Sequence, residues 1–204
     1  MQINLLHHTP LWVASKAIRK CWASESKSDT INTNDDIGEA DRALIDRVGN
    51  KNKHSSTLEH LNYTYDIEGI SRAVLQELSR HRMASLSVKS TRYTLKELKE
   101  TGRDDVAKFI VMGKNGMVNS RSCIQLLEIK CMLDLGISND VVKYMLPESY
   151  KTSLVWTINA RSLQNFLKLR TSKAALGEIR ELAYNIYEAL PEEHKYLFEG
   201  SINE

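Results

Sequence analysis

The sequence contains a basic cluster that is followed, after a spacer of seven residues, by a serine: Arg80, His81, Arg82 and then Ser90. Adjacent cations repel one another, so a fold keeps them together where an anion or an acidic partner compensates their charge. Arginine binds phosphate through two parallel hydrogen bonds, and the hydroxyls of Ser90 and Thr91 add donors. The cluster therefore predicts an anion site that suits a phosphate. A structural alternative exists for Arg80 and Arg82, because cations at a helix C-terminus offset the helix dipole.

A second polar cluster lies further along the chain, at Asn159, Arg161, Ser162, Asn165 and Arg170. On a helix, Arg161 and Asn165 are four residues apart and share a face. Asparagine both donates and accepts hydrogen bonds, which suits the mixed edge of a heterocycle. For Asn159 alone, an N-cap of the following helix is the simpler interpretation.

Both clusters lie in segments without acidic residues. Leu78–Lys96 and Ser149–Gly177 together hold ten Lys and Arg, whereas the other residues hold 18 basic and 26 acidic side chains, a net charge of −8. This distribution predicts a localised anion site and not a surface for a polyanion. The alternatives are a nucleic-acid-binding module that places both segments on phosphates, or two solvated basic faces.

Composition places the chain among globular proteins, with 204 residues, 42% hydrophobic and 26% charged. No apolar run reaches the roughly 20 residues of a membrane helix, and no secretory signal pattern opens the chain. We therefore expect a soluble, cytoplasmic protein without a membrane partner. Cys21, Cys123 and Cys131 are expected to be buried in helices and not paired in disulfides. His54 and His60 do not match a metal-binding spacing, so no metal is predicted.

Alternation of apolar and polar residues predicts strands over Leu61–Glu68 and Thr152–Ile158, with a shorter one over Gln2–Leu6. Spacing and capping residues predict seven helices. The first begins near Pro10 after a Thr9 cap, and the second runs over Ile37–Val48 and stops at Gly49. Two more run over Ser71–His81 and 117–135, and the last three follow caps at Ser138, Asn159 and Ser172. The cap-rich segment 32–36 is expected to start the second helix, and 83–94 is expected to be loop or short extended chain. Strands and helices do not alternate regularly, which favours the α+β class.

The clusters resemble the motifs of one family. The pattern Arg80-His81-Arg82-x7-Ser90, continued by Arg92-Tyr93, matches the RHRx7S signature of flavin-dependent thymidylate synthases (ThyX). Two further segments resemble motifs of the same family and occur in the family's order. They are Leu58-Glu59-His60 and the segment 156–170, WTINARSLQNFLKLR.

The resemblance implies an enzyme that makes dTMP from dUMP. FAD would be the cofactor, 5,10-methylenetetrahydrofolate the methylene donor and NADPH the reductant. It also implies a single ThyX-like domain over residues 1–204, with a central, mostly antiparallel sheet flanked by helices. Family members are homotetramers whose sites are built from several subunits, and no nucleic acid partner is expected.

The resemblance also implies roles for individual residues. FAD would be bound by Ser56, Arg80, His81, Arg82, Val88, Asn159, Ala160, Arg161 and Asn165. dUMP would be bound by Glu77, Leu78, Ser79, Arg80, Val88, Lys89, Ser90, Thr91, Arg92, Lys143 and Arg170. Arg170 would be catalytic, because a guanidinium can stabilise negative charge that develops on N3 and O2 of the pyrimidine. Ser90 would bind and not attack, because a serine nucleophile needs a base within reach and His81 is assigned to flavin.

Some positions depart from the family pattern. Val88 stands where an acid is usual, Gln76 and Glu77 stand where an Arg or Gln pair is common, and Lys143 stands where an arginine commonly contacts dUMP. A lysine meets a phosphate as a point charge and with less directionality than arginine. A flavin- or nucleotide-binding protein that has lost the synthase reaction is therefore a third alternative.

Overall fold

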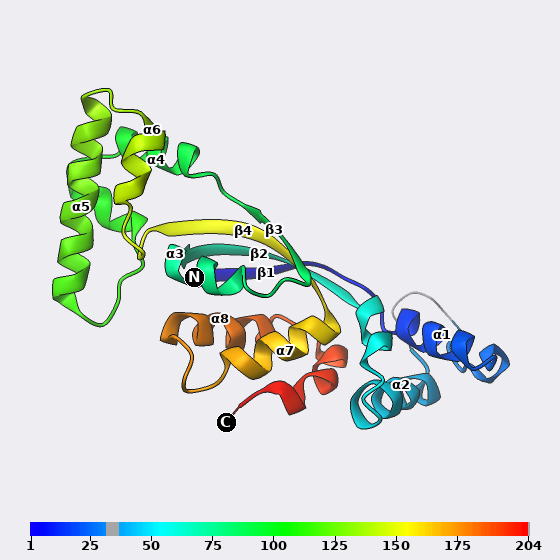
Figure 1. Ribbon diagram of the computed structural model, residues 1–204. Coiled ribbons are helices and arrows are strands. Elements are labelled where there is room, and N and C mark those ends of the chain that lie inside the picture. The colour runs from blue at the N-terminus through cyan, green and yellow to red at the C-terminus, as the bar shows by residue number, and fades with distance from the viewer. Residues whose placement is uncertain (32–36, 204) are drawn as a thin grey trace. The chain divides into compact units, whose positions relative to one another are not determined.

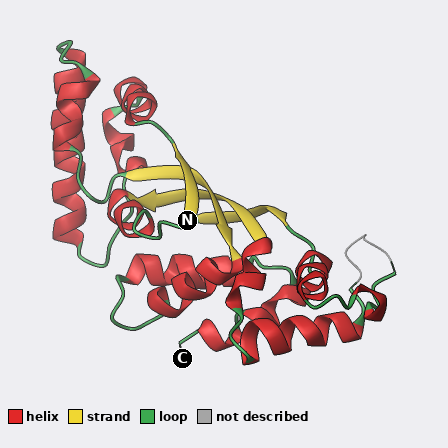
Figure 2. Cartoon of the chain, turned by 45° about the vertical axis from the view of Figure 1, so that its right-hand side comes forward, coloured by secondary structure: helices red, strands yellow, loops and turns green. Residues whose placement is uncertain are grey.

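The computed structural model describes residues 1–31 and 37–203. Its four strands form one sheet in the order β1-β2-β4-β3, drawn in yellow in Figure 2. The strands are β1 (Gln2–His8), β2 (Asn62–Ser71), β3 (Ala84–Val88) and β4 (Lys151–Asn159). The segment 32–36, which the sequence predicted to cap a helix, lies outside the described residues.

Backbone hydrogen bonds at the strand ends define the strand directions. Arg72 N donates to Tyr150 O (3.0 Å), which joins the end of β2 to the start of β4, and Ala160 N donates to Leu61 O (2.8 Å) at the opposite ends of the same strands. Bonds of this kind, in which the end of one strand meets the start of its neighbour, mark an antiparallel ladder. The other two strand pairs have equivalent bonds, Thr9 N to Asn62 O (2.9 Å) and Lys89 N to Ser153 O (2.8 Å).

Helices make up most of the remaining chain (Figure 1). They are α1 (Trp12–Cys21), α2 (Glu39–Ile45), α3 (Arg72–Leu78), α4 (Thr91–Glu100), α5 (Gly116–Asp134), α6 (Asn139–Val142), α7 (Ala160–Arg170) and α8 (Gly177–Glu188). An antiparallel sheet accompanied by these helices confirms the predicted α+β class.

The chain divides into two compact units. Unit 1 contains Met1–Gln2, Ile67–Arg80 and Leu86–Val155, and unit 2 contains Ile3–Asp66, His81–Ser85 and Trp156–Glu204. The expectation of a single domain over the whole chain stays a prediction.

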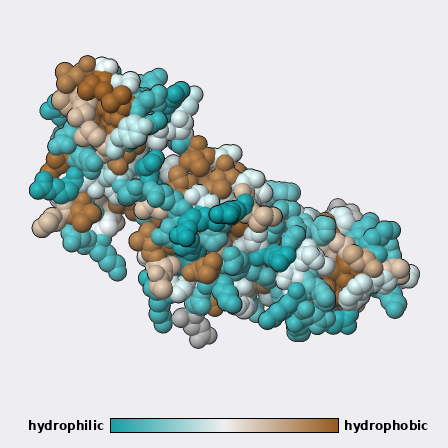
Figure 3. Space-filling model, in the orientation of Figure 1, coloured by the Kyte–Doolittle hydropathy of each residue, from teal (hydrophilic) through white to brown (hydrophobic). Residues whose placement is uncertain are grey.

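Unit 1 is built around the packing of α5 against α4 and α6, which lie beside it in Figure 1. Its core is a cluster of apolar side chains: Leu95, Leu98, Val106, Ile110, Leu126, Ile129, Leu133, Val142 and Tyr150. Apolar side chains also gather on its surface in Figure 3, where α5 ends and α6 begins, with Leu135 77% and Val141 60% exposed.

Unit 2 packs α7 against α8, and both helices contribute buried apolar faces. Tyr63, Tyr65 and Trp156, which lie in the two strands predicted from alternation, are fully buried on β2 and β4. The Tyr63 hydroxyl lies 2.8 Å from Nδ1 of the buried His194. Burial lowers the pKa of His194 to about 3, so this imidazole is neutral at physiological pH.

Two predicted caps are wrong because their hydroxyls bond elsewhere. Thr9 does not cap α1, which has Leu11 at its N-cap, and Thr9 Oγ1 instead accepts from Asn62 N (3.1 Å) at the adjoining strand. Ser172 does not cap α8, which begins at Gly177, because Ser172 Oγ accepts from Ala174 N (3.3 Å) within a preceding turn.

Other boundaries also differ from the sequence predictions. The segment 83–94 contains the strand β3 and the start of α4, and α3 ends at Leu78, three residues before His81. Gly49 does not end a helix but lies inside a π-helical turn, Asp46–Lys51. Cys21 and Cys131 are exposed and only Cys123 is partly buried, so the predicted burial of the cysteines is wrong for two of the three.

Among residues 1–31 and 37–203, no helix combines the length and the apolar composition that crossing a membrane requires.

A buried ion pair stabilises the N-terminal part of unit 2. Arg19 Nε on α1 donates to Asp41 Oδ1 on α2, and the Asp41 side chain is fully buried. The hydroxyls of Ser28 and Thr30 donate to its other oxygen at 2.5 and 2.6 Å. Burial alone would raise the pKa of Asp41, but the hydrogen bonds from Ser28, Thr30 and Arg19 outweigh it and lower the pKa below its usual value.

We predict that Asp41→Ala lowers the free energy of unfolding by about 3–5 kcal/mol, because it leaves the Arg19 guanidinium buried without its partner. The measurement is the urea midpoint at pH 7 and at fixed protein concentration. A group whose pKa is lowered by folding stabilises the fold above its unfolded pKa of about 4 and loses that effect as the pH falls through the folded value. The gap between wild type and variant should therefore shrink below about pH 4.

The matched control is Asp46→Ala. Asp46 pairs with Lys51 at 2.8 Å, and the Lys51 side chain is 72% exposed, so its loss should cost about 0–1 kcal/mol. Equal effects of the two substitutions would contradict the role given to the buried pair.

Candidate functional site

In unit 1, the residues predicted to hold the nucleotide phosphate lie where β3 ends and α4 begins. Ser90 is the N-cap of α4, and its Oγ accepts from Arg92 N (3.3 Å), which satisfies one of the free amides of the first turn. Thr91 is the first residue of α4, and Lys89 N pairs with Ser153 O on β4. The cap fixes the serine at the helix start and leaves its hydroxyl hydrogen available to a ligand.

A single carboxylate brings two of the predicted basic residues together. Asp140 on α6 accepts from Arg92 Nη2 at 3.1 Å through Oδ2 and from Lys143 Nζ at 3.3 Å through Oδ1. Asn139 Nδ2 also donates to the Arg92 carbonyl oxygen (3.2 Å). The hydrogen bond from Lys143, followed by the charge of Arg92, lowers the pKa of Asp140. Arg92 and Lys143, far apart in the sequence, are therefore neighbours in unit 1.

The end of α3 presents its predicted residues in different ways. The Leu78 side chain is fully buried, so contact with a nucleotide would have to use its backbone. Ser79 Oγ donates to Gln76 O (2.8 Å), and the Glu77 side chain is partly buried. Arg80 lies beyond the helix end and is exposed.

In unit 2, the structure brings His81 and Arg170 together. Arg170 Nε, at the end of α7, donates to His81 Nε2 at 3.0 Å. The His81 ring also meets the edge of Phe166, with ring centroids 5.0 Å apart and planes at 77°. A residue predicted to bind flavin thus contacts the residue predicted to act on the pyrimidine.

The start of α7 holds the other predicted flavin residues. Asn159 is confirmed as the N-cap, since its side chain accepts from Ser162 N (2.9 Å). Arg161 Nη1 pairs with Glu59 Oε1 at 2.6 Å. Ala160 is buried and its N–H donates to Leu61 O just before β2, so a flavin contact would need another of its backbone atoms. Asn165, one turn after Arg161, is exposed.

The two arginines of the RHR motif differ from the other basic site residues. Arg80 and Arg82 are both exposed, and neither has an acidic partner among the residues that the structure describes. Ser56 and Val88 are also exposed, Ser56 in the 3₁₀ helix Ser55–His60 of unit 2 and Val88 at the end of β3. These positions are accessible to a ligand.

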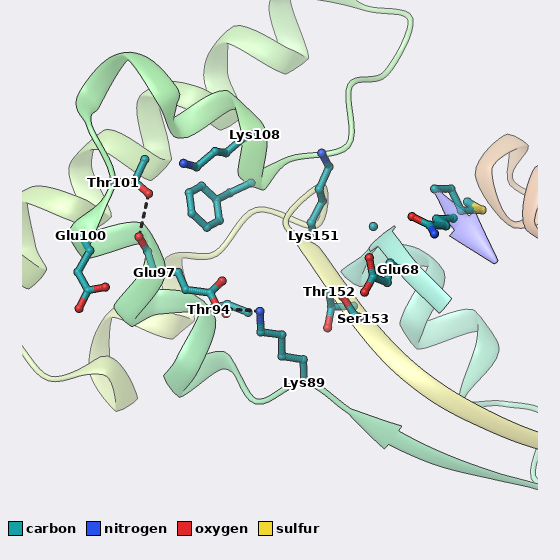
Figure 4. A pocket seen from close by; sticks show the side chains of 14 residues that line it. Glu68, Lys89, Thr94, Glu97, Glu100, Thr101, Lys108, Lys151, Thr152 and Ser153 are labelled. Atoms are coloured by element: carbon teal, nitrogen blue, oxygen red, sulfur yellow. Dashed lines mark hydrogen bonds and ion pairs between the residues drawn. The ribbon is translucent and has the colours of Figure 1, made fainter. Parts of the chain in front are cut away.

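Unit 1 also contains a cavity of about 830 Å³ that the motifs do not account for (Figure 4). Three acidic and three basic side chains line it: Glu68, Glu97, Glu100, Lys89, Lys108 and Lys151. Of the residues predicted to bind FAD or dUMP, Lys89 alone is in its lining, and its Nζ is paired with Glu97 Oε1 at 2.7 Å.

Sequence reasoning missed three residues that hold site side chains in place. Asp140 could have been suspected from its helical spacing to Lys143. Glu59 and Phe166 both lie in the family motifs, but nothing in the sequence indicates that Glu59 pairs with Arg161 or that Phe166 contacts His81. Their partners come from distant segments, and no local spacing signals such pairs.

The donor set of unit 2 fits a flavin dinucleotide. Arg82, Arg161 and Asn165 are exposed and can donate to the oxygens of a diphosphate. The first turn of α7 contains no acidic residue that would repel an anion. The carboxylate of Glu59 compensates only one of the two guanidinium groups.

Comparison with known proteins gives concordant matches over the chain. Residues 4–194 match the family model described as thymidylate synthase complementing protein. The flavin-dependent thymidylate synthase of Wolinella succinogenes is 58% identical over 204 residues, with 97% of each chain covered. The flavin-dependent thymidylate synthase of Helicobacter pylori is 52% identical over 212 residues, with 99% of each chain covered.

Solved structures agree with these matches. The crystal structure of ThyX from Helicobacter pylori with FAD and dUMP has a TM-score of 0.92 and 49% identity, and both chains are covered completely. A UMP/dUMP methylase, PolB from Streptomyces cacaoi, shares the fold at a TM-score of 0.75 and 24% identity. From the family model, the relatives and the fold together, the chain belongs to the flavin-dependent thymidylate synthases, as its motifs predicted.

Proposed function

We propose that the protein converts dUMP to dTMP, with FAD as cofactor, 5,10-methylenetetrahydrofolate as methylene donor and NADPH as reductant. The observation that carries this proposal is the signature Arg80-His81-Arg82-x7-Ser90. It occurs in a chain that matches, over its whole length, a relative whose crystal structure contains FAD and dUMP.

The residues proposed to hold FAD are Ser56, Arg80, His81, Arg82, Val88, Asn159, Ala160, Arg161 and Asn165. FAD, when bound, carries reducing equivalents from NADPH to the transferred carbon. The exposed guanidinium groups of Arg82 and Arg161 supply the forked donors that a diphosphate accepts. Because Arg161 is already paired with Glu59, its orientation is fixed before a ligand arrives.

The residues proposed to bind dUMP are Glu77, Leu78, Ser79, Arg80, Val88, Lys89, Ser90, Thr91, Arg92, Lys143 and Arg170. Arg92 and Lys143 are held near each other by the exposed carboxylate of Asp140. A phosphate carries more negative charge and more acceptor oxygens than one carboxylate, so it can compete for both cations. This arrangement supports a phosphate role for Lys143 despite the loss of the fork that an arginine would bring.

Arg170 is proposed to act on the pyrimidine. Its guanidinium remains charged and can stabilise negative charge that develops on N3 and O2, which activates the ring without a covalent bond to the enzyme. Ser90 is proposed to bind and not to attack. Its Oγ already caps α4, and His81, the nearest base in the sequence, has its Nε2 engaged by Arg170.

The assembly is proposed to be a homotetramer formed from single-domain subunits. The exposed apolar side chains at the junction of α5 and α6 support it, because apolar surface of this kind marks association sites. The protein is proposed to act in the cytoplasm, where its three free cysteines would stay reduced.

The decisive experiment is the visible absorption spectrum of the purified protein, before and after addition of FAD and then of NADPH with dUMP. We expect flavin bands that persist through gel filtration and bleach on reduction. Formation of dTMP after addition of 5,10-methylenetetrahydrofolate should follow. A protein that stays colourless and does not retain added FAD would overturn the proposed function.

Arg170→Ala should lower turnover by about 100-fold or more, because it removes the group that stabilises the developing charge. FAD should stay bound, as judged from the flavin spectrum, while dTMP formation and dUMP binding are measured. Lys168→Ala, an exposed residue of the same helix, is the matched control and should keep normal turnover. Normal activity of the Arg170 variant would refute its assignment.

Ser90→Ala should impair synthesis without abolishing it. Loss of one hydrogen bond to a charged ligand is worth about 1.5–3 kcal/mol, so kcat/KM for dUMP should fall by about 10-fold to 100-fold. Ser87→Ala, an exposed serine of β3, should leave the value unchanged. Complete loss of turnover with dUMP still bound would restore the nucleophile hypothesis for Ser90.

A further inference from the structure

We infer that His81 is a positioning residue for Arg170, holding its guanidinium through Nε2 as a neutral hydrogen-bond acceptor. The inference rests on the proposed function, because Arg170 is the residue proposed to act on the pyrimidine. It gives the middle residue of the RHR motif a task in addition to flavin binding.

The hydrogen bond fixes the protonation of the imidazole. Arg170 Nε lies 3.0 Å from His81 Nε2. A guanidinium has five N–H donors, no acceptor, and is not deprotonated in proteins. Nε2 must therefore carry the lone pair, and His81 is the neutral tautomer with its proton on Nδ1. A doubly protonated ring would place two donors and two positive charges against each other.

The ring of His81 is itself held in place by aromatic packing. Phe166 lies one turn before Arg170 on α7 and meets the His81 ring edge-to-face at 5.0 Å. Phe166 is fully buried and packs on the buried Trp156 of β4, with ring centroids 5.0 Å apart and planes at 65°. The acceptor for Arg170 is thus anchored on the core of unit 2.

The consequence for Arg170 is a restricted side chain. Arginine has several rotatable bonds, and ordering them costs rotamer entropy. A bond at Nε, where the planar group begins, fixes both the position and the tilt of the guanidinium plane. If the folded protein holds this orientation before dUMP binds, less ordering is needed at the moment of reaction.

Two near-isosteric substitutions separate positioning from flavin binding. In His81→Gln the side-chain oxygen can lie near the former Nε2 and accept from Arg170. In His81→Asn the shorter amide can replace only the Nδ1 end of the ring. Both variants lose the contact with the Phe166 ring, so that loss cancels in the comparison.

At saturating FAD we expect His81→Asn to lower kcat/KM for dUMP by about 10-fold to 100-fold, the scale of effect of a misplaced catalytic group. His81→Gln should lie within about 5-fold of wild type, since the acceptor is kept. The FAD dissociation constants of both variants are measured separately, and their thermal midpoints control for folding. Equal impairment of the two variants would overturn the inference.

A second readout does not depend on turnover. With ¹⁵N-labelled histidine, multiple-bond ¹H–¹⁵N spectra of the full protein distinguish the two neutral tautomers and the charged form, and His81→Gln identifies the His81 signals. We expect the Nδ1–H tautomer in wild type and a changed Nε2 signal in Arg170→Ala. An unchanged signal, or a charged His81 at neutral pH, would overturn the inference. Absence of FAD binding or turnover in wild type would instead count against the proposed function.

Discussion

The antiparallel pairing of β2 with β4 is the constraint on which the positions of the site residues depend. Each strand leads directly into a helix, and the last residue of the strand is the N-cap of that helix. Ser71 ends β2 and caps α3, and Asn159 ends β4 and caps α7. A slip of one residue in this pairing would turn Tyr65 and Trp156 from the core to the opposite face. Both are fully buried, so the register is fixed by their burial. The register therefore determines where α3 and α7 begin. It thereby determines where Arg80 lies relative to β2 and where Arg170 lies relative to β4.

The basic segments of the sequence are compensated selectively. Three of their cations form ion pairs with carboxylates that lie outside the two acid-free segments. The pairs are Lys89 with Glu97, Arg92 with Asp140, and Arg161 with Glu59. These pairs have largely exposed members, so each contributes little to stability but orients a cation. Among the described residues, Arg80 and Arg82 have no such partner. The molecule thus keeps some cations oriented and leaves others uncompensated, which suits a protein that binds more than one anionic group.

Local signals in the sequence predicted the parts of the fold that local physics determines. The alternation of Tyr63, Tyr65 and Ile67 predicted β2 because one face of the strand is buried, and Asn159 was predicted as a cap because its side chain bonds within its own first turn. The sequence predicted only loop or short extended chain where β3 lies. Its five residues, Ala84–Val88, do alternate apolar and polar side chains, but the run is short and mostly exposed, so the signal is weak. Asp140 was missed because its contact with Arg92 joins distant segments. The predictions of Thr9 and Ser172 as caps were wrong because their hydroxyls accept from other backbone amides in the fold. The sequence does not reveal that competition.

The RHR motif contains an electrostatic problem that the fold partly solves. A protonated His81 would place a third positive charge between two arginines, whereas a ring that accepts a hydrogen bond from Arg170 adds none. The motif then carries two positive charges and not three, and they belong to the two exposed arginines. The neutral ring packs on the buried Phe166, which a charged imidazole would do only at a cost in desolvation. A single hydrogen bond thus keeps a third charge out of the motif, suits the contact of the partly buried His81 ring with Phe166 and orients the guanidinium of Arg170.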